Sequence, residues 1–246
     1  MRVIVVENYE EMSKKAALMI ASQLYLNPKS VLGLATGSTP VGMYEELIRL
    51  YESGEIDFSQ AMSFNLDEYY GISKDKKQSY HSFMKETFFD HINIPEDKRF
   101  IPDGLAEDVE NECRNYDKSI IEMGGIDIQV LGIGVNGHIG FNEPNINFEA
   151  KTHLVNLDEQ TIKDNARFFD SIDEVPRQAI SMGMKTIMQS KKIVLLASGK
   201  NKADAIQKTI EGKITSDLPA SLLQIHKDVV IIVDKEAGEK LSRRDI

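Results

Sequence analysis

The sequence predicts an α/β protein built on one open, mainly parallel sheet with helices on both faces. Short runs of β-branched and other apolar residues recur along the chain, and several are apolar throughout, as strands buried on both faces are. Amphipathic helical patterns separate these runs. Alternation of strand and helix from one end of the chain to the other is typical of open α/β sheets of the Rossmann-like kind.

The predicted strands are apolar runs bounded by turn residues, and they cover residues 2–7, 31–35, 62–66, 126–133, 193–197 and 229–233. The predicted helices cover residues 9–26, 40–51, 106–121 and 201–211. In residues 106–121 the apolar side chains recur at steps of three and four, which places Cys113 on a buried stripe. Asn201 is suited to the N-cap of the last helix.

Two polar stretches show neither the helical nor the strand period of apolar residues, and they are predicted to be irregular. Residues 67–80 read DEYYGISKDKKQSY and are expected to form a long loop. Residues 142–175 are polar and poorly periodic, and long connections of this kind are often active-site lids. The chain has no repeat and no Gly/Ser linker, so residues 1–246 are predicted to form a single domain with a lid in 142–175.

Composition excludes several classes of protein. The chain has 246 residues, of which 41% are hydrophobic and 28% charged, as in ordinary globular proteins. It has one cysteine, no apolar run near the roughly 18 residues of a membrane helix, and no signal-peptide pattern. We therefore expect a cytoplasmic protein without a disulfide or a membrane anchor.

The charge balance argues against a nucleic-acid partner. The chain carries 29 basic and 39 acidic residues, a formal net charge of -10, whereas proteins that bind duplexes usually carry a basic surplus. The acidic surplus of this chain repels anionic ligands at long range, so a site for an anion needs concentrated local donors.

Ligands of open α/β sheets bind beyond the carboxyl ends of the strands, so functional residues are expected directly after each strand. The strand at 31–35 is followed by a short polar turn and then by Pro40 and a helix. Its backbone N–H groups, hydroxyls and helix dipole could hold a phosphate, although a capped turn without a ligand has the same pattern. The turn consists of Thr36, Gly37, Ser38 and Thr39.

Two carboxylates, Asp67 and Glu68, follow the strand at 62–66. A carboxylate at this position could serve as a general base for a substrate in the cleft. The alternative is a helix cap or a solvated loop acid, which is the commoner fate of a single aspartate.

The segment after the strand at 126–133 contains the largest group of candidate catalytic residues. It reads GVNGHIGFNEP, with His138 among glycines and Glu143 five residues later. Histidine moves protons near neutral pH, and a carboxylate can fix its tautomer. A histidine that is only hydrogen-bonded within a loop is the alternative.

Other chemistries lack support in the sequence. Residues 132–137 match G-x-G-x-x-G, but the following HIGFNEP cannot begin the helix that a dinucleotide site requires. No H-E-x-x-H, C-x-x-C or G-x-S-x-G pattern is present, so neither a metal site nor a serine nucleophile is indicated. Acid–base chemistry by carboxylates and a histidine remains.

Two basic residues could supply the local donors that an anion requires. Arg167 lies next to two phenylalanines, and Lys202 follows the glycine of a strand–helix turn. Most lysines and arginines are solvated surface residues, but a lysine at a strand end is better placed than the average one.

These segments together resemble the glucosamine-6-phosphate deaminase (isomerase) family, which shares a superfamily with 6-phosphogluconolactonase. The resemblance runs in family order along almost the whole chain. It rests on GLATGSTPVGMYEEL, SFNLDEYYGI, SYHSFM, LGIGVNGHIGFNEP, LLASGKNKADAI and ASLLQIHKDVVIIVD.

The resemblance implies conversion of glucosamine 6-phosphate and water to fructose 6-phosphate and ammonia, without a metal or organic cofactor. It gives His138 the proton transfer that opens the sugar ring and Glu143 the task of assisting and orienting it. Asp67 would take the proton from C2 and return it to C1. The phosphate would be held by Thr36, Gly37, Ser38 and Thr39 together with Arg167 and Lys202.

One position departs from the commoner family pattern. Many members have aspartate where this chain has Asn136, directly before the Gly-His pair. An amide can hold an imidazole by a hydrogen bond but cannot stabilise imidazolium by charge. His138 is therefore expected to depend more on Glu143, with activity retained.

The resemblance also bears on partners and on rival functions. Longer members are hexamers activated by N-acetylglucosamine 6-phosphate, whereas this chain ends soon after its last strand, which favours an unregulated monomer or small homo-oligomer. A 6-phosphogluconolactonase-like hydrolase is one alternative, but it has no need of a C2 base. A non-catalytic sugar-phosphate sensor is another, but it would normally carry a DNA-binding module.

Overall fold

The computed structural model describes residues 1–145, 147–166, 169 and 171–242. The strands are β1 Arg2–Val6, β2 Val31–Leu34, β3 Met62–Asn65, β4 Asp67–Tyr70, β5 Arg99–Phe100, β6 Ile128–Leu131, β7 His153–Asn156, β8 Gln178–Ser181, β9 Lys192–Ala197 and β10 Val229–Asp234. The α-helices are α1 Tyr9–Leu26, α2 Val41–Glu52, α3 Tyr80–Thr87, α4 Val109–Glu122, α5 Glu159–Asn165, α6 Met184–Met188 and α7 Ala203–Glu211. The 3₁₀ helices are η1 Phe89–His91, η2 Glu96–Lys98, η4 Ile172–Glu174, η5 Lys200–Lys202 and η6 Pro219–Ile225.

Seven strands form one parallel sheet in the order β1-β10-β9-β6-β2-β3-β5. From β2 the chain continues outward to β3 and β5, and then returns to β6 on the other side of β2. The connections therefore reverse direction between β2 and β6. In open α/β sheets this reversal opens a crevice at the carboxyl ends of the strands, where ligands bind.

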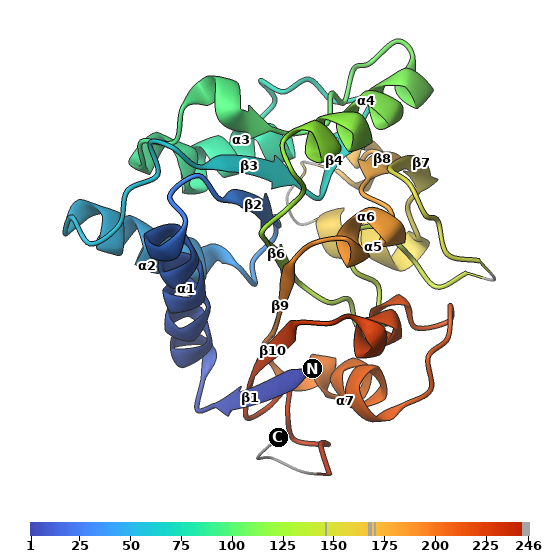
Figure 1. Cartoon of the computed structure of the whole chain (residues 1–246). Helices are drawn as coiled ribbons and strands as arrows, with labels where there is room; N and C mark the ends of the chain where they lie inside the picture. The colour runs from blue at the N-terminus through green and yellow to red at the C-terminus, as the bar shows by residue number, and fades with distance from the viewer. Residues whose placement is uncertain (146, 167–168, 170, 243–246) are drawn as a thin grey trace.

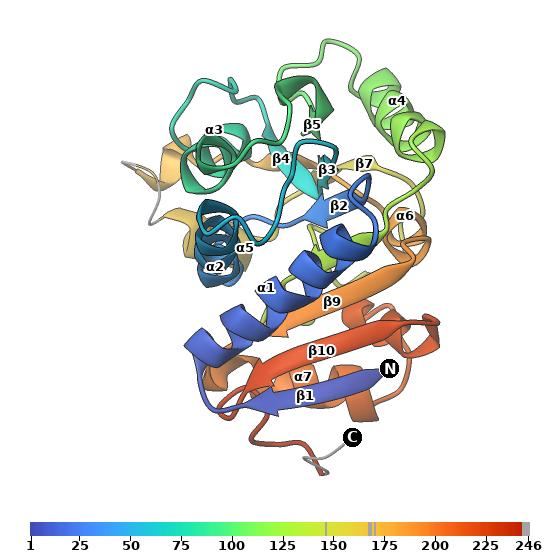
Figure 2. The same cartoon turned by 60° about the vertical axis from the view of Figure 1, so that its left-hand side comes forward.

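Helices cover both faces of the sheet, as the sequence predicts. Side chains of α1, α2 and α3 pack on one face, and α1 lies alongside β9 and β10 (Figure 2). Side chains of α4, α6 and α7 pack on the opposite face. All six residues of β10 are buried because they alternate between the two layers: Val229, Ile231 and Val233 face one, and Val230 and Ile232 the other.

A second, antiparallel sheet has the order β4-β8-β7. β4 continues from the end of β3, and Figure 1 shows the three strands together near α6. A single residue, Leu66, joins the two sheets. Its N–H donates to the carbonyl of Leu34 at 3.0 Å, and its carbonyl accepts from the N–H of Met182 at 2.7 Å.

Three expectations are corrected by this arrangement. Residues 67–80 are not wholly a loop, because Asp67–Tyr70 form β4 and α3 begins at Tyr80. β4 is almost wholly buried, so it lacks the alternation of a half-exposed strand, and its partner β8 lies far along the chain. Residues 142–175 contain β7 and α5.

The start of α7 is the third correction. Asn201 does not cap this helix; it lies inside η5, and Lys202 precedes the first residue of α7. The left-handed φ of 90° at Gly199 turns the chain so that its carbonyl accepts from the N–H of Lys202. That hydrogen bond closes a 3₁₀ turn in place of a side-chain cap.

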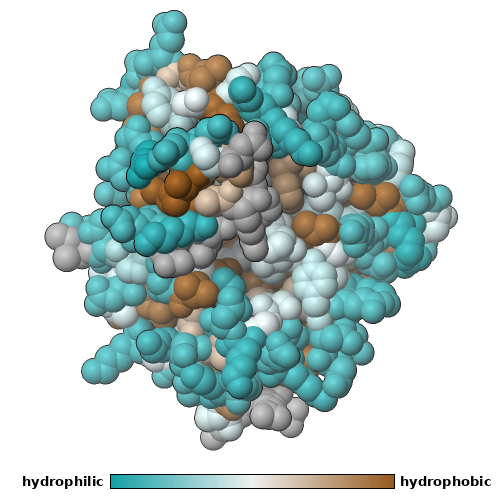
Figure 3. Space-filling view, turned by 180° about the vertical axis from the view of Figure 1, so that it is seen from behind, coloured by the Kyte–Doolittle hydropathy of each residue, from teal (hydrophilic) through white to brown (hydrophobic). Residues whose placement is uncertain are grey.

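Apolar side chains on the surface are scattered. The face seen from behind in Figure 3 is mostly hydrophilic, with apolar groups that are small and separate. No helix among the described residues is long and apolar enough to cross a membrane.

Candidate active site

A pocket of about 240 Å³ opens at the carboxyl ends of β2, β3 and β6, where the connections reverse. The structure places seven of the predicted site residues around it from these three strand ends: Thr36, Gly37, Ser38, Thr39, Asp67, Asn136 and His138. Lys202 lines the same pocket from η5. Residues that are far apart in the sequence thus share one cavity, because parallel strands end at the same edge of the sheet.

The turn after β2 is held by two tyrosines. The Tyr44 hydroxyl donates to the carbonyl of Ala35 at 2.6 Å, and the Tyr9 hydroxyl donates to the carbonyl of Ser38 at 3.1 Å. Gly37 adopts a left-handed φ of 89°, which L side chains rarely adopt. Helix α2 begins at Val41, one residue after Pro40, so its N-terminus and the preceding amides lie beside the pocket.

Asp67 is the buried acid of the pocket, with 6% of its surface exposed. Burial raises the pKa of its carboxyl to about 8, and the neighbouring charge of Glu68 adds to the rise. Gly140 lies opposite, and a Cβ there would stand 3.6 Å from a carboxylate oxygen of Asp67. A carboxylate of raised pKa in a cavity is suited to act as a general base.

Glu68 points away from the pocket into the protein. Its carboxylate accepts three backbone N–H groups, from Tyr69 at 2.8 Å, Tyr80 at 2.9 Å and His81 at 2.8 Å. Burial raises the pKa of Glu68 to about 7, although these hydrogen bonds oppose the rise. Glu68 thereby ties β4 to the first turn of α3 and holds Tyr80 at the pocket wall.

His138 and Glu143 form a hydrogen-bonded pair. The imidazole Nδ1 lies 3.0 Å from Oε2 of Glu143. The turn before the ring is tight: the N–H of Gly134 donates to the carbonyl of His138, and a Cβ at Gly134 would lie 2.4 Å from the imidazole. Only glycine leaves room for the ring at that point.

Asn136 acts on this pair through Glu143 and the backbone rather than through the imidazole. Its amide donates to Oε2 of Glu143 at 2.7 Å, and its side-chain oxygen accepts from the backbone N–H of His138 at 3.2 Å. Burial acts to raise the pKa of Glu143, but hydrogen bonds from His138, Asn136 and Thr161 and the charge of His138 outweigh it, so the pKa is lowered.

Lys202 owes its place to a buried carboxylate. Asp234, at the end of β10, accepts from the hydroxyl of Ser198 and from the N–H of Gly199. These bonds fix the turn that leads into η5. Arg167, the other predicted phosphate ligand, lies outside the described residues.

Two side chains of the pocket wall that carry hydroxyls, Tyr80 and Thr161, were not among the predicted site residues. Tyr80 begins α3, and its ring packs on Phe141 with centroids 6.2 Å apart. Thr161 lies on α5 and donates to Oε1 of Glu143 at 2.8 Å. SYHSFM carried the only signal for Tyr80, and the aperiodic stretch around Thr161 carried none.

No group of three histidine, cysteine, aspartate or glutamate side chains within the described part of the chain could hold a metal ion. Fold and pocket together define an open α/β protein with an acid–base site at the carboxyl edge of its sheet, beside a turn suited to a phosphate.

Comparison with known proteins identifies the family. A family model described as glucosamine-6-phosphate isomerases/6-phosphogluconolactonase matches residues 7–232. The chain belongs to this family. It is 60% identical over 242 residues to a glucosamine-6-phosphate deaminase of Clostridium botulinum strain Hall, with 98% of this chain and 99% of the relative covered. It is 59% identical over 241 residues to that of Halothermothrix orenii, covering 98% and 100%.

Solved structures agree with this assignment. One, described as a monomeric glucosamine-6-phosphate deaminase, superposes with a TM-score of 0.95 at 49% identity and covers 97% of this chain and 99% of its own. A 6-phosphogluconolactonase from Trypanosoma cruzi gives a TM-score of 0.75 at 22% identity, covering 98% and 97%, and shows the shared fold.

Proposed function

We propose that this protein is a glucosamine-6-phosphate deaminase, which converts glucosamine 6-phosphate and water to fructose 6-phosphate and ammonia. The observation that carries the proposal is that Asp67 shares one pocket with the turn after β2 and with His138, whose imidazole contacts Glu143 outside the pocket lining. The deaminase relatives, at 49–60% identity, support it more closely than the lactonases, at 18–22%.

Binding begins at the phosphate. The backbone amides and hydroxyls of Thr36, Gly37, Ser38 and Thr39 hold it, with Lys202 supplying positive charge and Arg167 proposed as a second cation. Anchoring the phosphate fixes which sugar carbons meet the carboxylate and the imidazole.

Ring opening requires a proton to move between the C1 hydroxyl and the ring oxygen. His138 carries this proton, and Glu143 orients the imidazole through Nδ1. The C1–O5 bond breaks as C1 becomes an aldehyde, so the amino sugar is held in its open form.

Asp67 then removes the proton from C2. The electron pair of that C–H bond forms the C1=C2 bond, while the π pair of the C1=O bond moves to O1, which takes a proton from water to give an enolamine. Asp67 returns the proton to C1, which leaves an iminium at C2. Water adds to C2 and ammonia departs, giving the ketose. One base serves both carbons because they are adjacent.

We further propose that the protein acts in the cytoplasm as a monomer, and that residues 142–175 act as the lid of a single domain. The solved relative that is described as monomeric supports the monomeric state. The lid is supported by two residues of this segment: Thr161 lines the pocket, and its hydroxyl donates to Glu143.

The test is the release of ammonia and fructose 6-phosphate from glucosamine 6-phosphate by purified protein in the presence of a chelator. Equal amounts of both products are expected. A parallel assay with N-acetylglucosamine 6-phosphate measures any activation. Tight binding without products would indicate a sensor instead, and turnover of 6-phosphogluconolactone alone would indicate a lactonase.

A further inference from the structure

Thr161 links α5 to the His138–Glu143 pair. It is buried, its surface lines the pocket, and its hydroxyl donates to Oε1 of Glu143 at 2.8 Å. Neither ring opening nor the proton transfer between C2 and C1 uses the Thr161 hydroxyl directly.

The two oxygens of Glu143 have separate partners. Oε2 receives Nδ2 of Asn136 at 2.7 Å and faces Nδ1 of His138 at 3.0 Å, whereas Oε1 accepts from Thr161. The terminal torsion of a glutamate is broad, so a carboxylate held at one oxygen can still turn. A donor at the second oxygen fixes the plane of the carboxylate, and with it the direction of the lone pair that faces the imidazole.

The position of Thr161 depends on how α5 is packed. Leu157 and Ile162, on either side of it, are buried in a cluster with Tyr69 and Phe141. Phe141 also lines the pocket. The apolar contacts that seat α5 therefore set the distance from the Thr161 hydroxyl to Glu143.

We propose that Thr161 is a positioning residue, which makes the orientation of Glu143 toward His138 depend on the seating of α5 against the pocket. The carboxylate is aligned for ring opening when α5 is packed in place, and is free to turn when α5 moves away. This inference rests on the proposed deaminase function.

Two substitutions separate the hydroxyl from the shape of the side chain. Thr161→Val keeps the volume and removes the donor, whereas Thr161→Ser keeps the donor. Thr209→Val is the matched control, because the buried hydroxyl of Thr209 on α7 has no hydrogen-bond partner among the described residues.

The kinetic test measures kcat and KM for glucosamine 6-phosphate, and the Kd of 2-amino-2-deoxyglucitol 6-phosphate, an open-chain amine that needs no ring opening. Thr161→Val should lower kcat about tenfold, the usual scale for a lost hydrogen bond to a charged group. The Kd of the open-chain amine should stay within about twofold because the phosphate contacts are unchanged. Thr161→Ser should recover most of the loss, and Thr209→Val should match the wild type.

A second measurement does not require turnover. Titration of carboxyl-labelled glutamate by ¹³C NMR should show a higher pKa for Glu143 in Thr161→Val, because a hydrogen bond to the ionised form is lost. An unchanged kcat, an equal loss in the serine variant, or an unchanged pKa of Glu143 would each overturn the role of Thr161. Failure of the proposed function is a different result: the wild-type protein would give no products.

Discussion

At the scale of single residues, Asp67 and Glu68 show how neighbouring carboxyls acquire different tasks. Both are buried and adjacent in β4, so their side chains point to opposite sides of the strand. Asp67 faces the pocket, while Glu68 is satisfied by three backbone N–H groups. A buried acid without such donors is expensive to ionise, which makes it a strong base once it is ionised.

The variant Asp67→Asn should abolish exchange of the C2 proton with solvent while leaving substrate binding largely intact. It should also stabilise the fold at high pH. In the wild type the folded pKa of about 8 exceeds the unfolded value of 3.8, so folding stability is lost as pH rises between these values. The variant avoids this loss, and its Tm should exceed that of the wild type by at least ~3 °C at pH 9.

At pH 4 the two proteins should melt within about 1 °C of each other, since Asp67 is then mostly protonated in the folded state and only partly ionised in the unfolded chain. Differential scanning calorimetry at both pH values checks the stability, and deuterium exchange monitored by NMR checks the chemistry. Exchange that persists in the variant would remove Asp67 from the role of C2 base.

At the scale of elements, the strand-end segments that meet at the pocket come from different connections. The turn after β2, the β3–β4 junction, the glycine-rich segment after β6 and η5 each contribute a part. Of these, η5 is a short 3₁₀ helix, fixed from β10 through Asp234. A cation carried there can be changed without touching the acid–base groups.

Lys202→Ala should weaken phosphorylated ligands selectively. The lost charge is expected to raise KM for glucosamine 6-phosphate at least about tenfold, the scale of a charge-assisted hydrogen bond, with a smaller change in kcat. Isothermal titration with glucitol 6-phosphate and with unphosphorylated glucosamine makes the comparison. Equal losses for both ligands would place Lys202 outside the phosphate site.

Some of these elements could be predicted from the sequence, and others could not. Strands such as β10 are predicted well because burial on both faces makes them apolar throughout, and α1 has the predicted bounds, with Asn8 as its side-chain N-cap. The small sheet is missed because β4 pairs with β8 more than a hundred residues later, so neither strand has a local signal. The same reason hides Thr161, whose relevance arises only when α5 packs beside Glu143.

Most of the pocket was predictable by one rule. Thr36, Asp67 and His138 follow three predicted strands, and parallel strands bring such residues to one edge. The rule does not predict Tyr80, which is held at the pocket by the buried carboxylate of Glu68. It also does not predict that the amide of Asn136 bonds to Glu143 and not to the imidazole.

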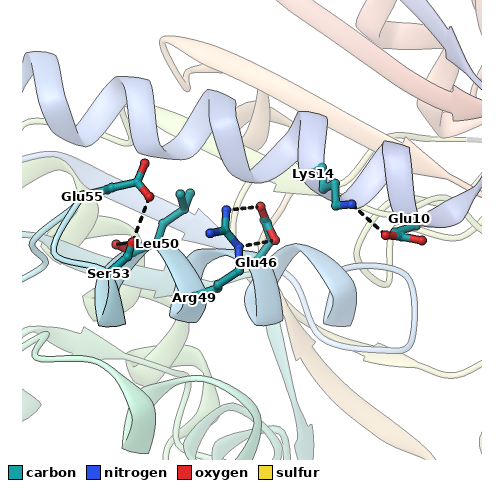
Figure 4. A network of polar contacts seen from close by, with 7 residues as sticks. All are labelled: Glu10, Lys14, Glu46, Arg49, Leu50, Ser53 and Glu55. Carbon is teal, nitrogen blue, oxygen red and sulfur yellow. Dashed lines mark hydrogen bonds and ion pairs between the residues drawn. The ribbon is translucent and has the colours of Figure 1, made fainter.

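At the scale of the whole molecule, stability comes from two apolar layers that share one sheet. Surface ion pairs add little. Glu10–Lys14 on α1 and Glu46–Arg49 on α2, shown in Figure 4, join side chains that are partly or largely exposed. Solvent screening leaves each such pair with little net effect on stability. The net charge of -10 opposes an anionic ligand, so affinity must come from the donors gathered at the pocket.

A chain with one shared core should unfold in one step. Thermal unfolding followed by far-UV circular dichroism and by the near-UV signal of its eight tyrosines should give coincident curves. Glucitol 6-phosphate at 100 times its Kd should raise the midpoint by about 5–10 °C. Two separated transitions would mean that the small sheet unfolds independently, contrary to a single domain.

The one-residue junction at Leu66 has a consequence for how this fold can vary. Successive side chains of a strand point to opposite sides, so one residue inserted between the sheets would move Asp67 to the side that Glu68 now occupies, away from the substrate, and would shift Glu68 to the position of Tyr69. The backbone hydrogen bonds of Leu66 to Leu34 and Met182 fix both sides of the junction, so an extra residue there cannot be accommodated without a shift of register. The spacing at this joint is therefore as much a requirement of the chemistry as the carboxylate itself.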